Sequence, residues 1–140
     1  MRKWVLVVML LLFVCCLGCD NVAESKTEAL SVEEKLVGEW GNDDISFVFY
    51  KDGSLAIIVD DFVVSTENEK EVLWAVDTTS DPIYLDIIMR RNETEDEFII
   101  PAILRFITDK KIQIVSTSDT ERPISFFPPT EEDSVVLSKK

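Results

Sequence analysis

The chain has 140 residues, 46% of them hydrophobic and 29% charged, and its formal net charge is −13. This length accommodates one compact domain rather than two. Such an acidic surface repels the phosphates of DNA and RNA, so nucleic-acid binding is not expected. The chain has no histidine, and its three cysteines all lie within residues 15–19. We therefore predict no metal site, no cofactor and no disulfide framework.

The first element in chain order is an apolar segment with a basic start. Fourteen apolar residues, from Trp4 to Leu17, follow Arg2 and Lys3. A membrane-spanning helix needs about 20 apolar residues, whereas a signal peptide has a shorter apolar stretch after its basic residues. The sequence therefore predicts that residues 1–18 are a signal peptide.

The end of this segment resembles the processing site of bacterial lipoproteins, where an aliphatic and a small residue precede the cysteine that becomes lipidated. Leu17, Gly18 and Cys19 match the pattern, whereas Cys16 occupies a position where leucine is usual. The resemblance implies that acyl chains such as palmitate on Cys19 anchor the protein to a bacterial membrane. The domain would then lie outside the cytoplasm, in the cell envelope. The alternative is an ordinary secretory signal with a coincidental cysteine.

A polar tether and a short helix are expected next. Residues 19–30 comprise the lipidated cysteine and a polar segment of ten residues, which would reach about 17 Å on average. Removal of residues 1–18 takes away two basic and no acidic residues, so the net charge changes from −13 to −15. Ser31 and Glu34 have the spacing of a capping box, which predicts a short helix ending at Gly38.

Residues 31–140 form the predicted domain, which is rich in β-branched and aromatic runs separated by turn residues. Asp52-Gly53 between two apolar runs predicts a hairpin. Eight antiparallel strands favour a closed barrel, because an open sheet would expose two edges, and a sandwich is the alternative. Pro101 predicts a bulge. The expected strands are residues 45–50, 55–64, 71–77, 83–90, 97–107, 111–117, 122–127 and 134–138.

Four stretches resemble the lipocalin-like (calycin) domain found in bacterial secreted proteins and lipoproteins, notably those of planctomycetes. They read LVGEW, FYKDGS, WAVDTTSDPIYLDI and ERPISF in that order, and the first contains the G-x-W motif with Gly38 and Trp40. The resemblance implies an all-β, eight-stranded antiparallel barrel after a short N-terminal helix. It also implies that Arg122 stacks on Trp40 and closes one end of the barrel. Residues 92–97 and 108–111 depart from the family pattern.

The candidate functional residues are apolar. Those expected to line a barrel cavity are Phe47, Phe49, Trp74, Leu85, Ile87 and Phe106. Strand alternation places Asp86 on the face opposite Leu85, where a solvated carboxylate is expected because burial of an unpaired charge is costly. The chain has neither a histidine base nor a G-x-S-x-G nucleophile motif, so we do not predict an enzyme.

The predicted function is the binding of a small apolar or amphipathic molecule in the barrel mouth, where such folds usually bind ligands. The alternative is an envelope interaction module, in which the barrel is packed solid and its acidic loops contact a cationic protein. An eight-stranded barrel is just wide enough for either outcome. The sequence leaves both open.

Overall fold

The structure, a computed structural model, describes residues 28–63, 70–91, 96–117, 120–127 and 133–140. The predicted signal peptide, Cys19 and most of the tether lie outside the described residues. The described part contains one helix, α2 (Val32–Leu36), and nine strands. The strands are β1 (Gly38–Gly41), β2 (Ile45–Phe49), β3 (Leu55–Val59), β4 (Phe62–Val63), β5 (Lys70–Asp77), β6 (Ile83–Arg91), β7 (Glu97–Thr108), β8 (Lys111–Ser116) and β9 (Ser134–Lys139).

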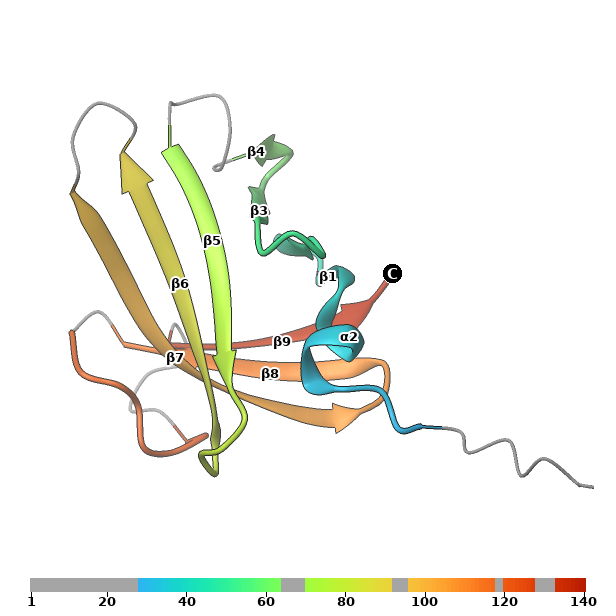
Figure 1. The fold of residues 1–140 in the computed structure, drawn as a ribbon. Helices are drawn as coiled ribbons and strands as arrows, with labels where there is room; N and C mark the ends of the chain where they lie inside the picture. The colour runs from blue at the N-terminus through green and yellow to red at the C-terminus, as the bar shows by residue number, and fades with distance from the viewer. Residues whose placement is uncertain (1–27, 64–69, 92–95, 118–119, 128–132) are drawn as a thin grey trace, which may run out of the picture.

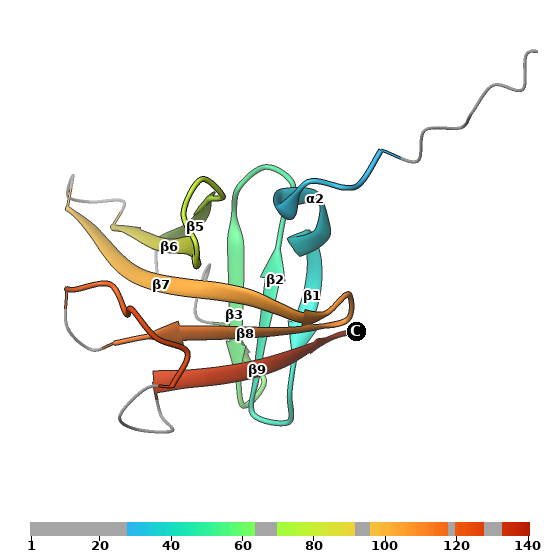
Figure 2. The ribbon, with the colours of Figure 1, turned by 90° about the horizontal axis from the view of Figure 1, so that it is seen from below.

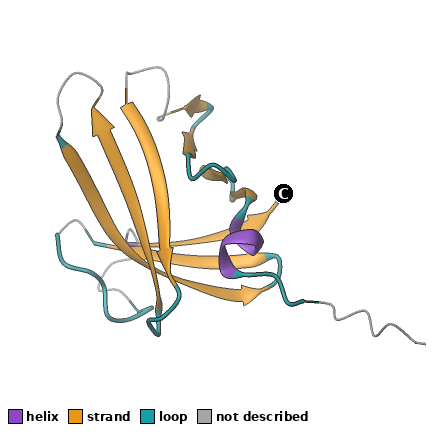
Figure 3. Ribbon diagram, viewed as in Figure 1, coloured by secondary structure: helices purple, strands orange, loops and turns teal. Residues whose placement is uncertain are grey.

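All nine strands belong to one antiparallel sheet, which curls into a half-barrel (Figure 1). Their order across the sheet is β4-β3-β2-β1-β9-β8-β7-β6-β5. β1 pairs with β9 and so joins the N-terminal hairpins to the C-terminal strand. Strands account for most of the described residues (Figure 3). The all-β antiparallel class expected from the sequence is confirmed.

The expected closed barrel of eight strands is wrong in both strand number and closure. β4 and β5 are the two edges of the sheet. β3 approaches β5 through an isolated bridge between Ser54 and Leu73 and a hydrogen bond of 2.9 Å from the Trp74 N–H to the Gly53 carbonyl. Because these contacts join the edges only beside the β2–β3 turn, the half-barrel is open next to β4.

Three local features explain the difference in strand number. One is β1 (Gly38–Gly41), which was not among the expected strands. The expected strand at residues 55–64 is split by Asp60 and Asp61, whose φ angles are 48° and 64°. Positive φ at both central residues makes the tight turn that suits a hairpin. The expected strand at residues 122–127 is absent, because Pro123 has no backbone N–H for a ladder. Residues 120–127 instead cross the outer face of the sheet, and we call this segment the outer strap.

Alternation along the strands places the core on the concave face. On β7, Ala102 and Leu104 belong to the core, whereas Ile103 between them faces outward and is buried where the outer strap crosses the sheet. The core residues are Leu36, Trp40, Phe47, Phe49, Leu55, Ile57, Val72, Leu85, Ile87, Ala102, Leu104, Ile112, Ile114 and Leu137.

One end of the half-barrel lies beside α2, the β7–β8 turn and the C-terminal residues (Figure 2). Both hydrogen bonds of the capping box form between Ser31 and Glu34, at 2.9 and 3.2 Å. The helix ends at Leu36, two residues before the expected Gly38. Gly38 opens β1 with φ of 125°, a conformation that residues with a Cβ rarely adopt. This backbone requirement explains the glycine of the G-x-W motif.

The bulge expected at Pro101 is also wrong. The register between β6 and β7 runs through Asp86 and Pro101 without a shift. The pairing between β7 and β8 stops one residue away, at Ala102 and Ser116. Pro101 therefore lies just beyond the residues of β7 that pair with β8, where a missing N–H is tolerated. The register shift in β7 lies instead between Phe106 and Thr108.

Candidate functional site

The six side chains expected to line a cavity lie together on the concave face, but they pack against one another. Phe47, Phe49, Leu85 and Ile87 are buried in the core, and Trp74 and Phe106 pack against it. The ring centroids of Phe49 and Trp74 are 5.3 Å apart in an edge-to-face contact. These residues therefore fill the middle of the half-barrel.

Apolar residues also continue along the concave face beyond the core, at the end opposite α2. By strand alternation, the cross-strand pairs Val59–Phe62 and Met89–Phe98 face the same side of the sheet as the core residues. Val59 is 37% exposed, Phe62 54% and Phe98 58%, whereas Met89 is half-buried. We call these four residues the mouth. β4, the end of β6 and the start of β7 lie at this end of the half-barrel (Figure 1).

Sequence reasoning did not separate the mouth from the core. Phe98 and Phe106 occupy equivalent phases of β7, and both are aromatic. The difference in exposure arises because α2 and β9 cover the Phe106 end. No signal in residues 97–108 alone contains that information, since the cover comes from distant segments.

Two arginines end β6 at the mouth, and they differ in their partners. Arg90 faces outward and donates a hydrogen bond of 2.9 Å to Glu97, with Glu71 3.7 Å away. The bond to Glu97, together with the charges of Glu97 and Glu71, raises the pKa of Arg90. Arg91 is exposed and, two residues after Met89 in β6, lies on the same face of the sheet. Among the described residues Arg91 forms no ion pair, so the mouth carries an available cation.

A second concavity lies between α2, the β2–β3 turn and β5. Its volume is about 410 Å³, within the range of ligand pockets. The Trp74 indole N–H donates a hydrogen bond of 3.1 Å to the Tyr50 carbonyl, which fixes the ring at this edge. We call the concavity the tryptophan groove, and it is lined by Glu33, Glu34, Val37, Lys51 and Trp74.

At the end covered by α2, which we call the closed end, Trp40 is fully buried, but its cation partner differs from the expected one. Its indole N–H donates a hydrogen bond of 2.7 Å to the Leu36 carbonyl. The Lys139 ammonium, and not Arg122, lies over the Trp40 ring, 5.1 Å from its centroid. The expected pairing of Trp40 with Arg122 is therefore wrong. The two residues lie on opposite faces of the sheet, because Arg122 belongs to the outer strap.

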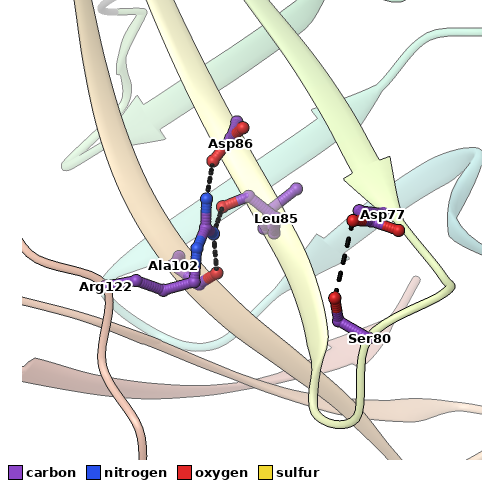
Figure 4. A network of polar contacts seen from close by, with 6 residues as sticks. All are labelled: Asp77, Ser80, Leu85, Asp86, Ala102 and Arg122. Carbon is purple, nitrogen blue, oxygen red and sulfur yellow. Dashed lines mark hydrogen bonds and ion pairs between the residues drawn. The ribbon is translucent and has the colours of Figure 1, made fainter.

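Arg122 fastens the outer strap to β6 and β7 (Figure 4). One guanidinium nitrogen donates to the carbonyls of Leu85 (3.3 Å) and Ala102 (2.6 Å). The other donates to the Asp86 carboxylate at 2.5 Å. The guanidinium also stacks on Tyr84, 4.3 Å from the ring centroid. Asp86 does face outward as expected, but Arg122 pairs with it and leaves only part of it to solvent.

Two aspartates order turns in the sheet. Asp52 accepts hydrogen bonds from the Ser54 hydroxyl (2.6 Å) and the Ser54 N–H (2.9 Å), which lower the pKa of Asp52 below 3.8. Asp77 accepts the equivalent bonds from Thr79, and Ser80 adds a longer one (Figure 4). These bonds lower the pKa of Asp77. Both carboxylates are exposed, and their hydrogen bonds order the turns.

Searches of protein-family models, curated proteins and solved structures found no match to this chain. The lipoprotein and lipocalin-like resemblances therefore stay predictions. Within the residues that the structure describes, no three or more metal-binding side chains gather. In the same part of the chain, no helix has the length and apolar character needed to cross a membrane. The candidate site therefore consists of the mouth, with the tryptophan groove as a second concavity.

Proposed function

We propose that this protein is an exported bacterial lipoprotein, anchored at Cys19, whose lipocalin-like half-barrel binds a small apolar or amphipathic molecule at its mouth. The anchor is supported by the basic start, the apolar segment and the Leu17-Gly18-Cys19 ending. Two or more acyl chains hold a protein stably at a membrane. The domain then works in the cell envelope, outside the cytoplasm.

The observation that carries the binding proposal is the exposure of the mouth. Residues on the concave face of a sheet are expected to be buried, yet Phe62 and Phe98 are more than half exposed there. Exposed aromatic side chains on a concave face favour a ligand. Arg91 supplies a charged group on the same face of the sheet as Met89. An amphipathic molecule with an apolar body and an anionic end suits this composition.

The interaction-module alternative has an observation of its own. On the outer strap, Ile124 is 94% exposed and Phe127 84%. Arg122 and the bond from Gln113 to the Phe126 carbonyl (3.2 Å) hold the strap in place. Rigid, protruding apolar side chains are typical of protein contact sites. The partner would be a protein whose cationic surface complements the acidic chain.

The anchor is tested by expression of the full chain in bacteria supplied with labelled palmitate. We expect label in the mature protein, its loss in Cys19→Ser, and its retention in Cys15→Ser, which lies outside the processing-site pattern. The second variant is the matched control, because it removes a thiol from the signal peptide only. Label that survives in Cys19→Ser would overturn the lipidation site.

The binding site is tested by native mass spectrometry of residues 19–140 with Cys19→Ser, exposed to a total lipid extract of the bacterial host. We expect an added mass that disappears on denaturation. Phe98→Ser should abolish it, whereas Phe127→Ser, which changes an equally exposed phenylalanine outside the mouth, should retain it. A bare mass would contradict small-ligand binding for that extract. An added mass lost equally in both variants would contradict the mouth as its site.

A further inference from the structure

Five lysines gather at the closed end of this acidic protein. They come from α2, from the β7–β8 turn and from the end of β9. These three segments lie side by side in both views (Figures 1 and 2). We call the group, Lys35, Lys110, Lys111, Lys139 and Lys140, the lysine end.

Hydrogen bonds and ring contacts hold the lysine end together. The Lys139 ammonium donates to the Lys35 carbonyl at 3.0 Å, and the Lys139 N–H donates to the Lys110 carbonyl at 2.9 Å. Lys111 pairs with Ser138 across β8 and β9. The Lys35 ammonium lies over Phe106. The fold therefore sets the backbone positions of these lysines and the side-chain positions of Lys35 and Lys139.

The lysine end retains a positive excess. Glu39 lies 3.2 Å from Lys140, and Asp109 lies beside Lys110 in the turn. Within the described residues, none of the other four lysines forms an ion pair. The nearby Glu33 and Glu34 line the tryptophan groove instead. Counted with Glu33 and Glu34 of α2, this end has five lysines and four carboxylates, a small positive excess in a chain whose net charge is −13.

Exposed aliphatic side chains accompany the lysines. Ile107 directly precedes the β7–β8 turn and is 46% exposed. Leu30 directly precedes the N-cap of α2 and is 59% exposed. Lysines beside exposed aliphatic side chains suit a lipid headgroup layer, where phosphates meet the first methylene groups. A nucleic acid or an acidic protein would leave the aliphatic residues without a partner.

We propose that the lysine end docks on anionic phospholipid headgroups and orients the half-barrel with its mouth away from the membrane. This inference rests on the proposed anchor at Cys19. The tether joins the domain at α2, so it leaves the molecule at the lysine end and brings this end to the membrane surface. Tethering makes even a weak contact effective, because the local concentration is high. The acidic remainder of the surface is repelled, which leaves one favoured orientation.

The test measures how fast each lysine is acetylated on vesicles. Residues 19–140 contain the helix, all described strands and a single thiol, Cys19. That thiol is coupled to a maleimide lipid in vesicles of phosphatidylcholine, alone or mixed with phosphatidylglycerol. A water-soluble acetylating reagent is added, and mass spectrometry follows each lysine. Lys70, the first residue of β5, pairs with Arg91 at the mouth end and is the internal control.

On phosphatidylglycerol vesicles we expect acetylation of Lys110 and Lys111 to slow about threefold or more, and acetylation of Lys70 to stay unchanged. In about 1 M salt the Debye length falls to about 3 Å, so the protection should disappear. Ile107→Ser should reduce the protection. Ile99→Ser is the matched control, because Ile99 is 43% exposed and Ile107 46%, and it should leave the protection unchanged.

Equal rates on both kinds of vesicle, or equal slowing of Lys70, would overturn the docking proposal. Because a chemical bond replaces the biological lipid, this outcome does not depend on lipidation in the cell. Absence of palmitate on Cys19 in bacteria would instead contradict the proposed anchor. The two failures are therefore distinguishable.

Discussion

The two ends of the half-barrel are built from the same kind of strand residue but reach opposite degrees of burial. At the closed end, Trp40, Leu104 and Leu137 are fully buried. At the mouth, Phe62 and Phe98 occupy the same concave face and are more than half exposed. α2 covers the first group with Leu36, and nothing equivalent among the described residues covers the second.

This difference separates stability from binding within one sheet. A side chain that is buried on all sides contributes several kcal/mol to folding, whereas one that is half exposed contributes much less. The closed end can therefore hold the fold together while the mouth keeps apolar surface available for a ligand. The following substitutions test this division.

Trp40→Ala should have the largest effect, because it removes a buried ring, its bond to Leu36 and its contact with Phe106. We expect the free energy of unfolding to fall by about 3–5 kcal/mol. Phe98→Ala should lower it by less than about 1 kcal/mol, since that ring is largely exposed. Urea unfolding measures both. Equal losses would contradict the division between the ends.

Arg122→Gln should have an intermediate effect, because it leaves Asp86 without its cation and releases the outer strap. A loss of about 1–3 kcal/mol in the free energy of unfolding is expected. Arg122→Lys should restore little, since an ammonium lacks the fork that contacts two carbonyls and a carboxylate. Limited proteolysis should cut residues 120–127 faster in both variants. Unchanged resistance of residues 120–127 to proteolysis would contradict the role of Arg122 in holding the outer strap.

A smaller effect should identify the cation over Trp40. Lys139→Gln and Trp40→Phe should show a coupling energy of about 0.5–1 kcal/mol in a double-mutant cycle. Arg122→Gln and Trp40→Phe should be additive, because these residues lie on opposite faces of the sheet. Coupling with Arg122 in place of Lys139 would restore the arrangement implied by the lipocalin resemblance.

The smallest effect concerns the β2–β3 turn, which borders the tryptophan groove. The folded state lowers the pKa of Asp52 below 3.8, so its contribution is present above the unfolded pKa and is lost as the pH falls through the folded value. Asp52→Asn should therefore destabilise at about pH 7 but not at about pH 2. Ser54→Ala should remove part of this pH dependence. If Asp52→Asn destabilised the protein equally in acid, the charge of the carboxylate would be excluded as the cause.

Local features of the fold could be predicted because neighbouring residues determine them. Asp52-Gly53 predicted the hairpin, and Gly53 has a φ of 88° there. Ser31 and Glu34 form the expected capping box. Alternation in residues 83–89 correctly placed Leu85 and Ile87 inside and Asp86 outside. Each of these inferences needed only a few consecutive residues and the period of a strand or helix turn.

The predictions that failed required knowledge of distant segments. Closure failed because Asp60 and Asp61 end β3 early and leave β4 at an edge. The strand expected at residues 122–127 is absent because Pro123 lacks a backbone N–H, and Arg122 binds β6 and β7 from the outer face. The cation over Trp40 was misassigned because Lys139 approaches from the last strand.

The sequence by itself determined that the described chain is an antiparallel all-β fold with a defined inward face, because strand period and turn chemistry are local properties. Its N-terminal segment also carries the prediction of export and lipidation. Only the tertiary structure decided which inward residues stay exposed at the mouth and which lysines meet at the closed end. Those outcomes depend on contacts between residues far apart in the chain, such as Lys35 with Lys139, and no local pattern encodes them.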